Sequence, residues 1–285
     1  MAKILERKRL APNIHLIEVQ APEIARKSRP GQFVIVMPDE KGERVPLSIA
    51  DWDAEKGSVT SVFLVVGTST RKLAVLEAGD EVPVIVGPLG RPSEIAPFGT
   101  VVLVAGCFGI GALYPTARAL KAAGNRVVAL IDAKSEDLVY WKERYRAVCD
   151  KVLFSSRDQA LGSREFVPRP LEELVAAEAP VARVIAVGCT YLMYASALAT
   201  KPLGVKTIVS LNPIMVDGTG MCGSCRVTVS GETRFACVDG PEFDAHAVDF
   251  DRLMQRQRIY LDEEREALEH HHASRCGCET GVPHG

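Results

Sequence analysis

A short segment rich in glycine and cysteine constrains this chain more than any other part of its sequence. Asp217 is followed by Cys222, Cys225 and Cys237, with four, two and eleven residues between successive members of the set. Glycines at positions 218, 220 and 223 allow a tight loop whose backbone N–H groups point inward. Plant-type [2Fe–2S] loops space their ligands in a similar way, with a distant fourth ligand. The segment therefore predicts an iron–sulfur site, with Asp217 in place of the first cysteine, and an electron carrier.

Two other interpretations of these cysteines stay open at this point. Structural zinc also accepts mixed thiolate and oxygen or nitrogen ligands, although such sites rarely need so many glycines. A Cys-x-x-Cys redox pair normally opens a helix in a βαβ unit. Here Cys225 leads into an alternating strand at 226–230, and Cys237 follows a turn at Gly231. This context favours the cluster over both alternatives.

The composition is that of an ordinary globular protein. Its 285 residues suffice for two domains and a small third unit. A formal net charge of −2 provides no basic excess for nucleic acid, and no charge block indicates a membrane-binding tail. The first ten residues lack the apolar run of a secretion signal, and no stretch approaches the roughly 18 apolar residues of a membrane span. We therefore expect a cytoplasmic protein whose eight cysteines serve cofactor ligation rather than disulfides.

The pattern of apolar runs divides the chain into three expected units. Residues 1–98 contain short apolar runs separated by Pro, Gly and Asp, which predicts an antiparallel barrel or sandwich with one helix at 69–77. Residues 99–211 alternate apolar strands with helices, which predicts a doubly wound α/β domain. Residues 212–285 hold the cluster segment, a helix expected over 250–270, and a His/Cys-rich tail. The fold class is therefore α+β multidomain.

Two glycine-containing turns lie between strands and helices of the expected α/β domain. Gly106-Cys-Phe108-Gly109-Ile-Gly111 follows the first strand, and Gly188-Cys189 follows a later one. Such turns at the carboxyl ends of parallel strands bind nucleotide pyrophosphates at a helix N-terminus, although one turn alone is equally typical of ordinary βα connections. Asp132 ends the second strand, where a carboxylate accepts hydrogen bonds from a ribose 2′-hydroxyl and repels a 2′-phosphate. This favours NADH over NADPH.

Residues 1–98 contain a second candidate nucleotide site. The run Arg44-Val-Pro46-Leu47-Ser48 places an arginine and a hydroxyl where they can contact a pyrophosphate and a flavin ring. Gly67-Thr68-Ser69-Thr70 precedes the expected helix and supplies N–H and hydroxyl donors for phosphate. A surface arginine and an ordinary helix cap explain each motif equally well when it stands alone.

Together these motifs resemble the ferredoxin–NADP reductase superfamily. The resemblance rests on the runs at 44–48, 67–70 and 87–90 and on the two glycine turns, and it covers about residues 1–260. The cluster runs at 216–229 and 235–244 narrow it to electron-transfer subunits similar to that of dihydroorotate dehydrogenase. They are closer still to the small (alpha) subunits of NADH-dependent reduced ferredoxin:NADP+ oxidoreductases, also known as sulfide dehydrogenase subunits. The dihydroorotate branch has Cys at the position of Asp217, so this residue argues for the transhydrogenase branch.

The resemblance implies a set of cofactors and the residues that hold them. FAD is expected on the barrel, NAD(H) in the α/β domain, and a [2Fe–2S] cluster on the C-terminal unit. Residues implied for FAD are Arg44, Pro46, Leu47, Ser48, Gly67, Thr68, Ser69 and Thr70. Residues implied for NAD(H) are Gly106, Phe108, Gly109, Gly111, Asp132, Gly188 and Cys189. Residues implied for the cluster are Asp217, Cys222, Cys225 and Cys237.

The resemblance also implies a partner. A large subunit with a second flavin and further clusters is expected to accept single electrons, and the pair to bifurcate electrons between NADH, NADPH and, indirectly, ferredoxin. The alternative is an electron-transfer subunit of a dihydroorotate, sulfide or hydrogenase-associated complex. A non-catalytic zinc protein without flavin is the competing prediction from a different class. His272, Cys276 and Cys278 carry metal-ligand side chains, but terminal residues of this kind are more often without a function.

Overall fold

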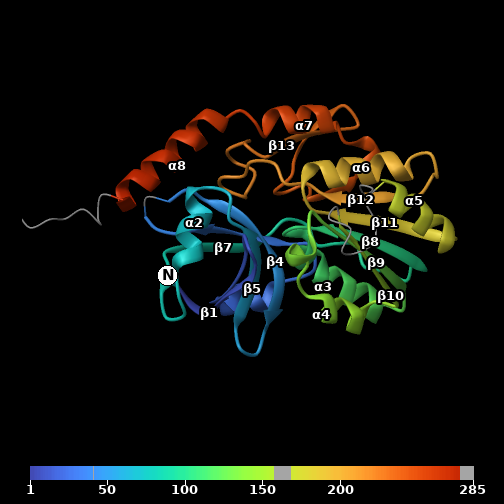
Figure 1. Ribbon diagram of the computed structural model, residues 1–285, viewed down its shortest axis with the longest axis horizontal. Helices are drawn as coiled ribbons and strands as arrows, with labels where there is room; N and C mark the ends of the chain where they lie inside the picture. Colours follow the sequence, from blue (N-terminus) through green and yellow to red (C-terminus); the bar gives the residue numbers. More distant parts are fainter. Residues whose placement is uncertain (41, 157–167, 277–285) are drawn as a thin grey trace, which may run out of the picture.

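The computed structural model describes residues 1–40, 42–156 and 168–276. Its N-terminal part is a seven-stranded antiparallel sheet in the order β6-β1-β2-β5-β4-β3-β7. The strands are β1 (Ala2–Ala11), β2 (Ile14–Gln20), β3 (Phe33–Met37), β4 (Val45–Asp53), β5 (Ser58–Leu64), β6 (Glu81–Val82) and β7 (Val84–Leu89). Only Pro83 separates β6 from β7, which lie at opposite ends of this order. The chain itself therefore nearly closes the sheet into a barrel (Figure 1).

Two features of this barrel differ from the sequence prediction. The apolar run at 82–86 was expected to be one strand, but it is divided at Pro83, which has no N–H to donate to a sheet ladder. A short helix, α1 (Pro22–Lys27), was not predicted. The expected helix is present as α2 (Thr68–Val75), and its Leu73 is fully buried in the barrel core with Val34, Ile49 and Phe63.

The second part is a parallel sheet with one antiparallel edge strand, in the order β10-β9-β8-β11-β12-β15. Its strands are β8 (Thr100–Gly106), β9 (Arg126–Ala133), β10 (Lys151–Ser156), β11 (Val181–Val187), β12 (Thr207–Ser210) and β15 (Glu242–Asp244). Its helices are α3 (Gly109–Ala122), α4 (Lys142–Val148), α5 (Pro168–Ala177) and α6 (Thr190–Thr200). Figure 1 shows α3 and α4 on one face of the sheet and α5 and α6 on the other. The doubly wound prediction is confirmed.

Burial on both faces explains why the strands of this sheet are continuously apolar. Along β8, Val102 and Val104 pack with Leu192 in one core, whereas Val101 and Leu103 pack with Ile110 in the other. All the residues of β8 after Thr100 are buried.

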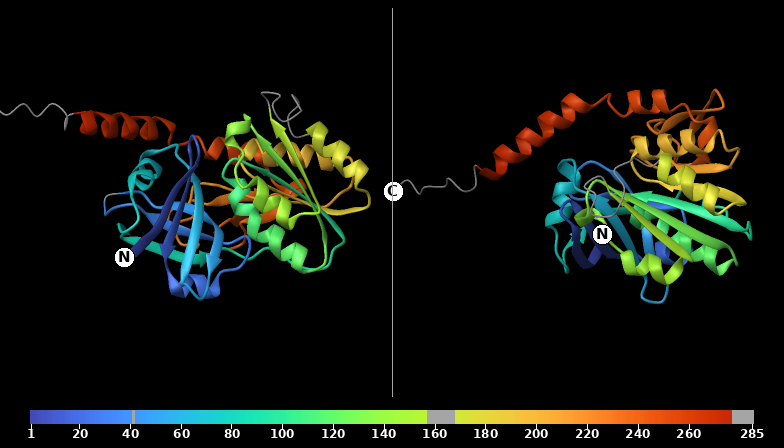
Figure 2. Two further views of the ribbon diagram at one scale, coloured as in Figure 1. Left: turned by 60° about the horizontal axis from the view of Figure 1, so that its bottom comes forward. Right: turned by 45° about the vertical axis from the view of Figure 1, so that its right-hand side comes forward.

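The C-terminal part joins the cluster loop to the α/β sheet. The hairpin of β13 (Arg226–Val229) and β14 (Glu232–Phe235) follows the loop, and β15 then pairs with β12. One helix was expected over 250–270, but the structure has α7 (Phe250–Arg256) and α8 (Leu261–Cys276) with a turn between them. At the turn, Gln257 Nε2 donates to the Asn212 carbonyl at 2.8 Å and ties the end of α7 to the segment after β12. Figures 1 and 2 show α8 running from this turn across the barrel.

Salt bridges and ring contacts join the barrel to the α/β part. Asp51 of β4 forms salt bridges with Arg118 of α3 at 2.9 Å and with Arg144 of α4 at 2.6 Å. The Arg144 guanidinium lies 4.2 Å from the ring centroid of Trp141. Cation–π contacts of this kind hold the guanidinium in a fixed place, so the two lobes meet in a defined orientation.

The two glycine turns touch each other through their backbones. A Cβ atom on Gly109 would lie 2.0 Å from the Val187 carbonyl oxygen, and one on Gly188 would lie 3.1 Å from the Gly106 carbonyl oxygen. A backbone oxygen cannot retreat as a flexible side chain can. Gly109 must therefore lack a side chain for α3 to begin against the end of β11.

We expect Gly109→Ala to lower the free energy of unfolding by about 3 kcal/mol, as a case of severe overpacking. Urea titration followed by circular dichroism measures it. The matched control is Gly124→Ala, where φ is +83° but no atom lies within 4 Å of the added Cβ. That control should lose only the left-handed cost of about 1 kcal/mol. Equal losses in the two variants would contradict the steric argument.

Candidate functional site

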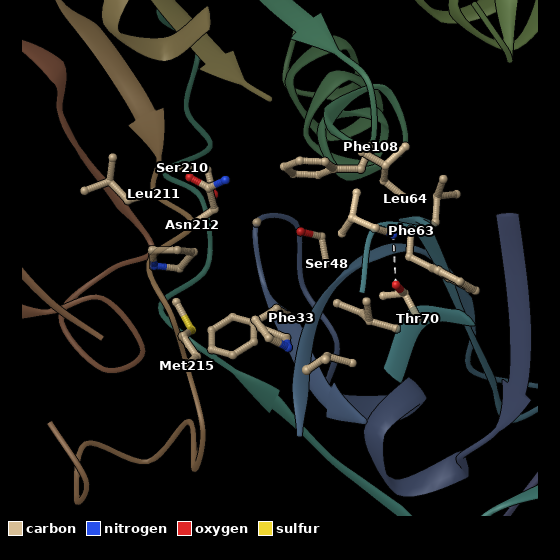
Figure 3. Close-up of a pocket in the computed structure, with 17 residues that line it drawn as sticks. Phe33, Ser48, Phe63, Leu64, Thr70, Phe108, Ser210, Leu211, Asn212 and Met215 are labelled. Carbon is tan, nitrogen blue, oxygen red and sulfur yellow. Dashed lines mark hydrogen bonds between the residues drawn. The ribbon is translucent and has the colours of Figure 1, made fainter. Parts of the chain in front are cut away.

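A cavity of about 250 Å³ lies where the barrel, the first glycine turn and the segment after β12 meet. Among the predicted residues, Pro46, Leu47, Ser48, Thr70 and Phe108 line it. Figure 3 shows Ser48 and Phe108 approaching the cavity from the barrel and the glycine turn, with Asn212 on a third side. The structure thus brings the run at 44–48 against the first glycine turn, although Ser48 and Phe108 lie 60 positions apart in the sequence.

Several residues of this cavity were not predicted. Phe33 and Phe63 come from barrel strands, and Leu211, Asn212 and Met215 follow β12. A signal for the last three existed: the carboxyl end of a parallel strand is where α/β sheets bind ligands. The apolar barrel residues carried no such signal, because their pattern is that of any core strand.

A second hollow lies at the N-terminus of α2. Gly67, Thr68, Ser69 and Thr70 line it together with residues of α8. Thr68 Oγ1 is buried there without a hydrogen-bond partner among the described residues. Arg71 Nε in the next turn also has none, but Arg71 lines a separate hollow with His15. Thr70 Oγ1 accepts hydrogen bonds from the N–H groups of Val66 and Gly67, both at 3.0 Å. A buried donor without a partner at a helix N-terminus fits an anion.

Carboxylates lie in the same hollow. Glu43 and Glu264 line it, and burial, followed by the neighbouring Glu43 carboxylate, raises the pKa of Glu264. Arg44, predicted to contact a pyrophosphate, is exposed just before β4 and lines neither hollow. The donors of α2 therefore offer the stronger anion site.

The first glycine turn is held by a buried tyrosine. Tyr140 Oη accepts a hydrogen bond from Gly111 N–H at 2.8 Å and donates one to the Cys107 carbonyl at 3.0 Å. Burial raises the pKa of Tyr140 far above its usual value, so the hydroxyl stays neutral and can make both bonds. Cys107 adopts φ of 52°, a left-handed conformation uncommon outside glycine.

The other predicted nucleotide residues lie around this turn. Gly188 and Cys189 directly precede α6, with Cys189 exposed at its N-cap. Asp132 pairs in register with Gly106 at the end of β9 but is buried, and it does not line the 250 Å³ cavity. The two turns and Asp132 are thus grouped at one edge of the sheet, as predicted from their positions at strand ends.

The loop 217–223 is held by its aspartate and its glycines. Asp217 accepts hydrogen bonds from Thr219 N–H at 2.7 Å and from Cys222 N–H at 2.8 Å, and these N–H groups lower the pKa of its carboxyl. Gly218, Gly220 and Gly223 all have positive φ. A Cβ on Gly218 would lie 2.6 Å from Leu89 Cδ1, so this glycine also lets the loop pack on the barrel.

The three cysteines of this region differ in exposure. Cys225 Sγ and Cys237 Sγ lie 3.2 Å apart in the core, whereas Cys222 is exposed, with its Sγ 3.3 Å from Ser224 Oγ. Burial raises the pKa of Cys237 to about 12, and the Ser224 hydroxyl lowers that of Cys222. In the part of the chain that the structure describes, no three His, Cys, Asp or Glu side chains form a site for a single metal ion. The ligand candidates form two pairs instead, Asp217 with Cys222 and Cys225 with Cys237.

The cysteine-containing region and almost the whole chain both match known proteins. Residues 212–249 match the iron–sulfur cluster binding domain of dihydroorotate dehydrogenase B. A dihydroorotate dehydrogenase B electron-transfer subunit homologue from Thermotoga maritima is 42% identical over 267 residues, which cover 94% of each protein. The chain belongs to the family of these electron-transfer subunit homologues. It is therefore an oxidoreductase subunit with an iron–sulfur cluster binding domain, and this role implies a partner subunit.

Two solved structures extend the comparison. A chain of the NADH-dependent reduced ferredoxin–NADP oxidoreductase, from work on flavin-based electron bifurcation, is 40% identical with a TM-score of 0.90. The match covers 95% of the present chain and 97% of that one. A ferredoxin–NADP+ reductase from Plasmodium falciparum, 13% identical with a TM-score of 0.56, shares the fold over 70% of this chain and 88% of its own. The family's barrel and α/β lobes thus have the ferredoxin reductase arrangement, as the sequence motifs predicted.

Regarding membranes, none of the helices within the described ranges combines the length and the apolar character that a transmembrane segment requires. Cys278 of the His/Cys-rich tail lies outside the described residues.

In the metal-free chain at pH 7.5, iodoacetamide should modify Cys222 at least about tenfold faster than Cys225 or Cys237, because thiolates react and Cys222 is exposed with a lowered pKa. Peptide mass spectrometry of timed samples gives the rates. Ser224→Ala should slow the modification of Cys222, because this change removes the hydroxyl that lowers the pKa of the Cys222 thiol. Equal rates at the three cysteines would show that the loop is not folded as described.

Proposed function

We propose that this subunit exchanges hydride with NAD(H) at a bound FAD and passes single electrons through a [2Fe–2S] cluster to a large partner subunit. The observation that carries the proposal is the shared cavity. Barrel residues that suit a flavin, the turn that suits a nucleotide and the segment leading into the cluster loop all line one 250 Å³ space. A cofactor in that space would have both redox partners as neighbours.

FAD fits the barrel side of this arrangement. Pro46, Leu47 and Ser48 offer a flat apolar wall with one hydroxyl, and Phe108 offers a ring on the opposite side (Figure 3). The unpartnered Thr68 Oγ1 and the N-terminus of α2 supply donors for phosphate in the hollow at α2. Gly67, Ser69, Thr70 and Arg44 complete the proposed set. FAD, when bound, supplies the conversion between two-electron hydride transfer and single-electron transfer.

The glycine turns support nicotinamide nucleotide binding next to this wall. Gly106, Gly109 and Gly188 let the two turns pack closely together at the carboxyl ends of β8 and β11, which is where parallel sheets bind nucleotides. Gly111, Cys189 and Asp132 complete the proposed set. Phe108 belongs to both this turn and the cavity, so the two sites adjoin. Asp132, as the carboxylate at the end of β9, supports NADH over NADPH.

The paired ligands support a cluster with two metal ions. A [2Fe–2S] cluster takes two protein ligands on each iron. The structure brings the sulfurs of Cys225 and Cys237 together, and it places Asp217 beside Cys222, whose backbone N–H donates to the carboxylate. Ligands must be deprotonated to bind metal. The N–H groups that lower the pKa of Asp217 favour its ionised form, whereas the buried pair must lose protons on loading.

The identity of the partner is the most specific part of the proposal. The match to the NADH-dependent reduced ferredoxin–NADP oxidoreductase chain supports a bifurcating complex. The large flavin and iron–sulfur subunit, with ferredoxin served indirectly, is what the sequence resemblance implies for the partner. The Thermotoga maritima relative supports the alternative, an electron-transfer subunit of a dihydroorotate dehydrogenase complex. Asp217 favours the bifurcating complex, because the similar loop of the dihydroorotate branch has Cys at the position of Asp217.

We expect the purified chain, kept anaerobic, to contain FAD and about two iron and two sulfide. Adding NADH should bleach its flavin absorption, and EPR should detect a reduced cluster. NADPH, tested at the same concentration, should react more slowly because of Asp132. Zinc in place of iron, with no flavin, would contradict the proposal and leave only the fold.

Asp217→Cys should still assemble a cluster, but with a changed absorption spectrum and a lower reduction potential, because a more strongly donating thiolate replaces a carboxylate. Anaerobic redox titration followed by EPR measures both. The control is Asp251→Asn, which removes an exposed carboxylate from α7. Identical spectra and potentials in D217C and the parent protein would exclude Asp217 as a ligand.

A further inference from the structure

A small polar cavity adjoins the proposed flavin site. It measures about 10 Å³, which is close to the space that one water needs. Gln32, Ser48, Thr116, Ser210 and Glu242 supply its polar lining. Ser48 and Ser210 also line the 250 Å³ cavity, so these two hydroxyl residues stand between the two spaces.

Glu242 is the titratable group of this small cavity. It begins β15, opposite Ser210 of β12, and its Oε1 accepts a hydrogen bond from Ser93 Oγ at 2.5 Å. Ser93 Oγ lies 3.1 Å from Thr116 Oγ1 of α3. A Cβ on Gly31 would lie 3.0 Å from Glu242 Oε1, so this glycine lets the carboxyl reach the wall of the flavin cavity.

The charges around Glu242 leave its carboxyl without a direct ionic partner among the described residues. Arg183 of β11 and Glu94 of the loop after β7 are the charged groups that act on it, with opposite effects. Arg183 Nη1 donates to Glu94 Oε2 at 2.9 Å, and its guanidinium lies 3.2 Å from the ring centroid of Phe98. Enclosure of the carboxyl group raises the pKa of Glu242, although the residue keeps some exposed surface on the edge strand.

The proposed function requires such a group. A hydride contains two electrons and one proton, so NADH yields NAD+, H+ and two electrons when the electrons leave singly. A [2Fe–2S] cluster carries the electrons but not the proton. One proton for each NADH must therefore leave the flavin site through the protein or solvent, and it must enter by the same route in the reverse direction.

We propose that Glu242 takes this proton, through one water in the small cavity and the Ser48 hydroxyl, and passes it to solvent at the edge of the sheet. The inference rests on the proposed function and adds a proton-handling residue to it. The proposal requires a side chain that gains and loses a proton at this place, rather than one that only hydrogen-bonds to Ser93.

Glu242→Gln in the full FAD-loaded chain provides the test, because the amide preserves shape and can still accept from Ser93 Oγ. In anaerobic stopped-flow experiments, NADH should reduce the flavin of E242Q at the parent rate. Reoxidation by a one-electron acceptor should be slowed about tenfold or more, since a positioned proton-transfer group contributes at least that much. The solvent deuterium isotope effect on reoxidation should also change.

A second readout is independent of turnover. The midpoint potential of the flavin, titrated against pH, should bend at the pKa of Glu242 in the parent protein and show no such bend in E242Q. Ser93→Ala removes a hydrogen bond that lowers this pKa, so the bend should move to higher pH. This variant also decides the matter if E242Q does not fold. Glu94→Gln, which changes a neighbouring carboxylate outside the small cavity, is the matched control: it should keep a bend, moved to lower pH because a charge that raises the pKa of Glu242 is removed.

The outcomes separate the two proposals. Parent-like reoxidation, isotope effect and pH dependence in E242Q would overturn the role of Glu242 and leave the flavin and cluster function standing. A bend that does not move in Ser93→Ala would also overturn it. A parent chain that binds no FAD, or whose FAD is not reduced by NADH, would overturn the proposed function itself.

Discussion

The contact between the two βα turns is the constraint on which the rest of this molecule depends. Peptide backbone meets peptide backbone there, because Gly109 and Gly188 have no side chains to hold β8 and β11 further apart. The contact fixes where α3 and α6 begin. It thereby fixes Phe108, which directly precedes α3, at the wall of the cavity. Tyr140 stabilises the same turn by occupying one of its N–H groups and one of its carbonyls.

The cluster segment shares its core with the α/β lobe rather than forming an independent unit. Cys225 and Cys237 belong to the same apolar core as Val102 of β8. A hydrogen bond also joins this segment to the loop after β7, because Arg91 N–H donates to the Gly240 carbonyl at 2.6 Å. A cluster held this way cannot move without disturbing the sheet. Its distance to the cavity is therefore set by packing, which suits electron transfer between fixed centres.

Local chemistry made much of the fold and site predictable, and long-range packing made the rest unpredictable. The continuous apolar strands, the glycine turns and the cysteine spacing each report a property of neighbouring residues. The turn at Gln257 lies against Asn212, a residue 45 positions earlier in the sequence. Glu242 resembled any strand carboxylate until β15 was seen to pair with β12 and bring it against Ser93. Such residues acquire their role only from the partners that folding supplies.

In the hollow at α2, carboxylates that repel an anion compete with hydrogen-bond donors that attract it. Glu43 and Glu264 oppose an anion, but carboxylates near solvent are screened, and a pair about 4 Å apart in water interacts by only about 1 kcal/mol. A hydrogen bond to a charged group is worth about 1.5–3 kcal/mol, and a helix N-terminus adds up to about 1 kcal/mol. The buried Thr68 hydroxyl without a partner and the helix N-terminus together therefore outweigh the carboxylates. Burial raises the pKa of Glu264, so its charged form is less favoured in this hollow than in water.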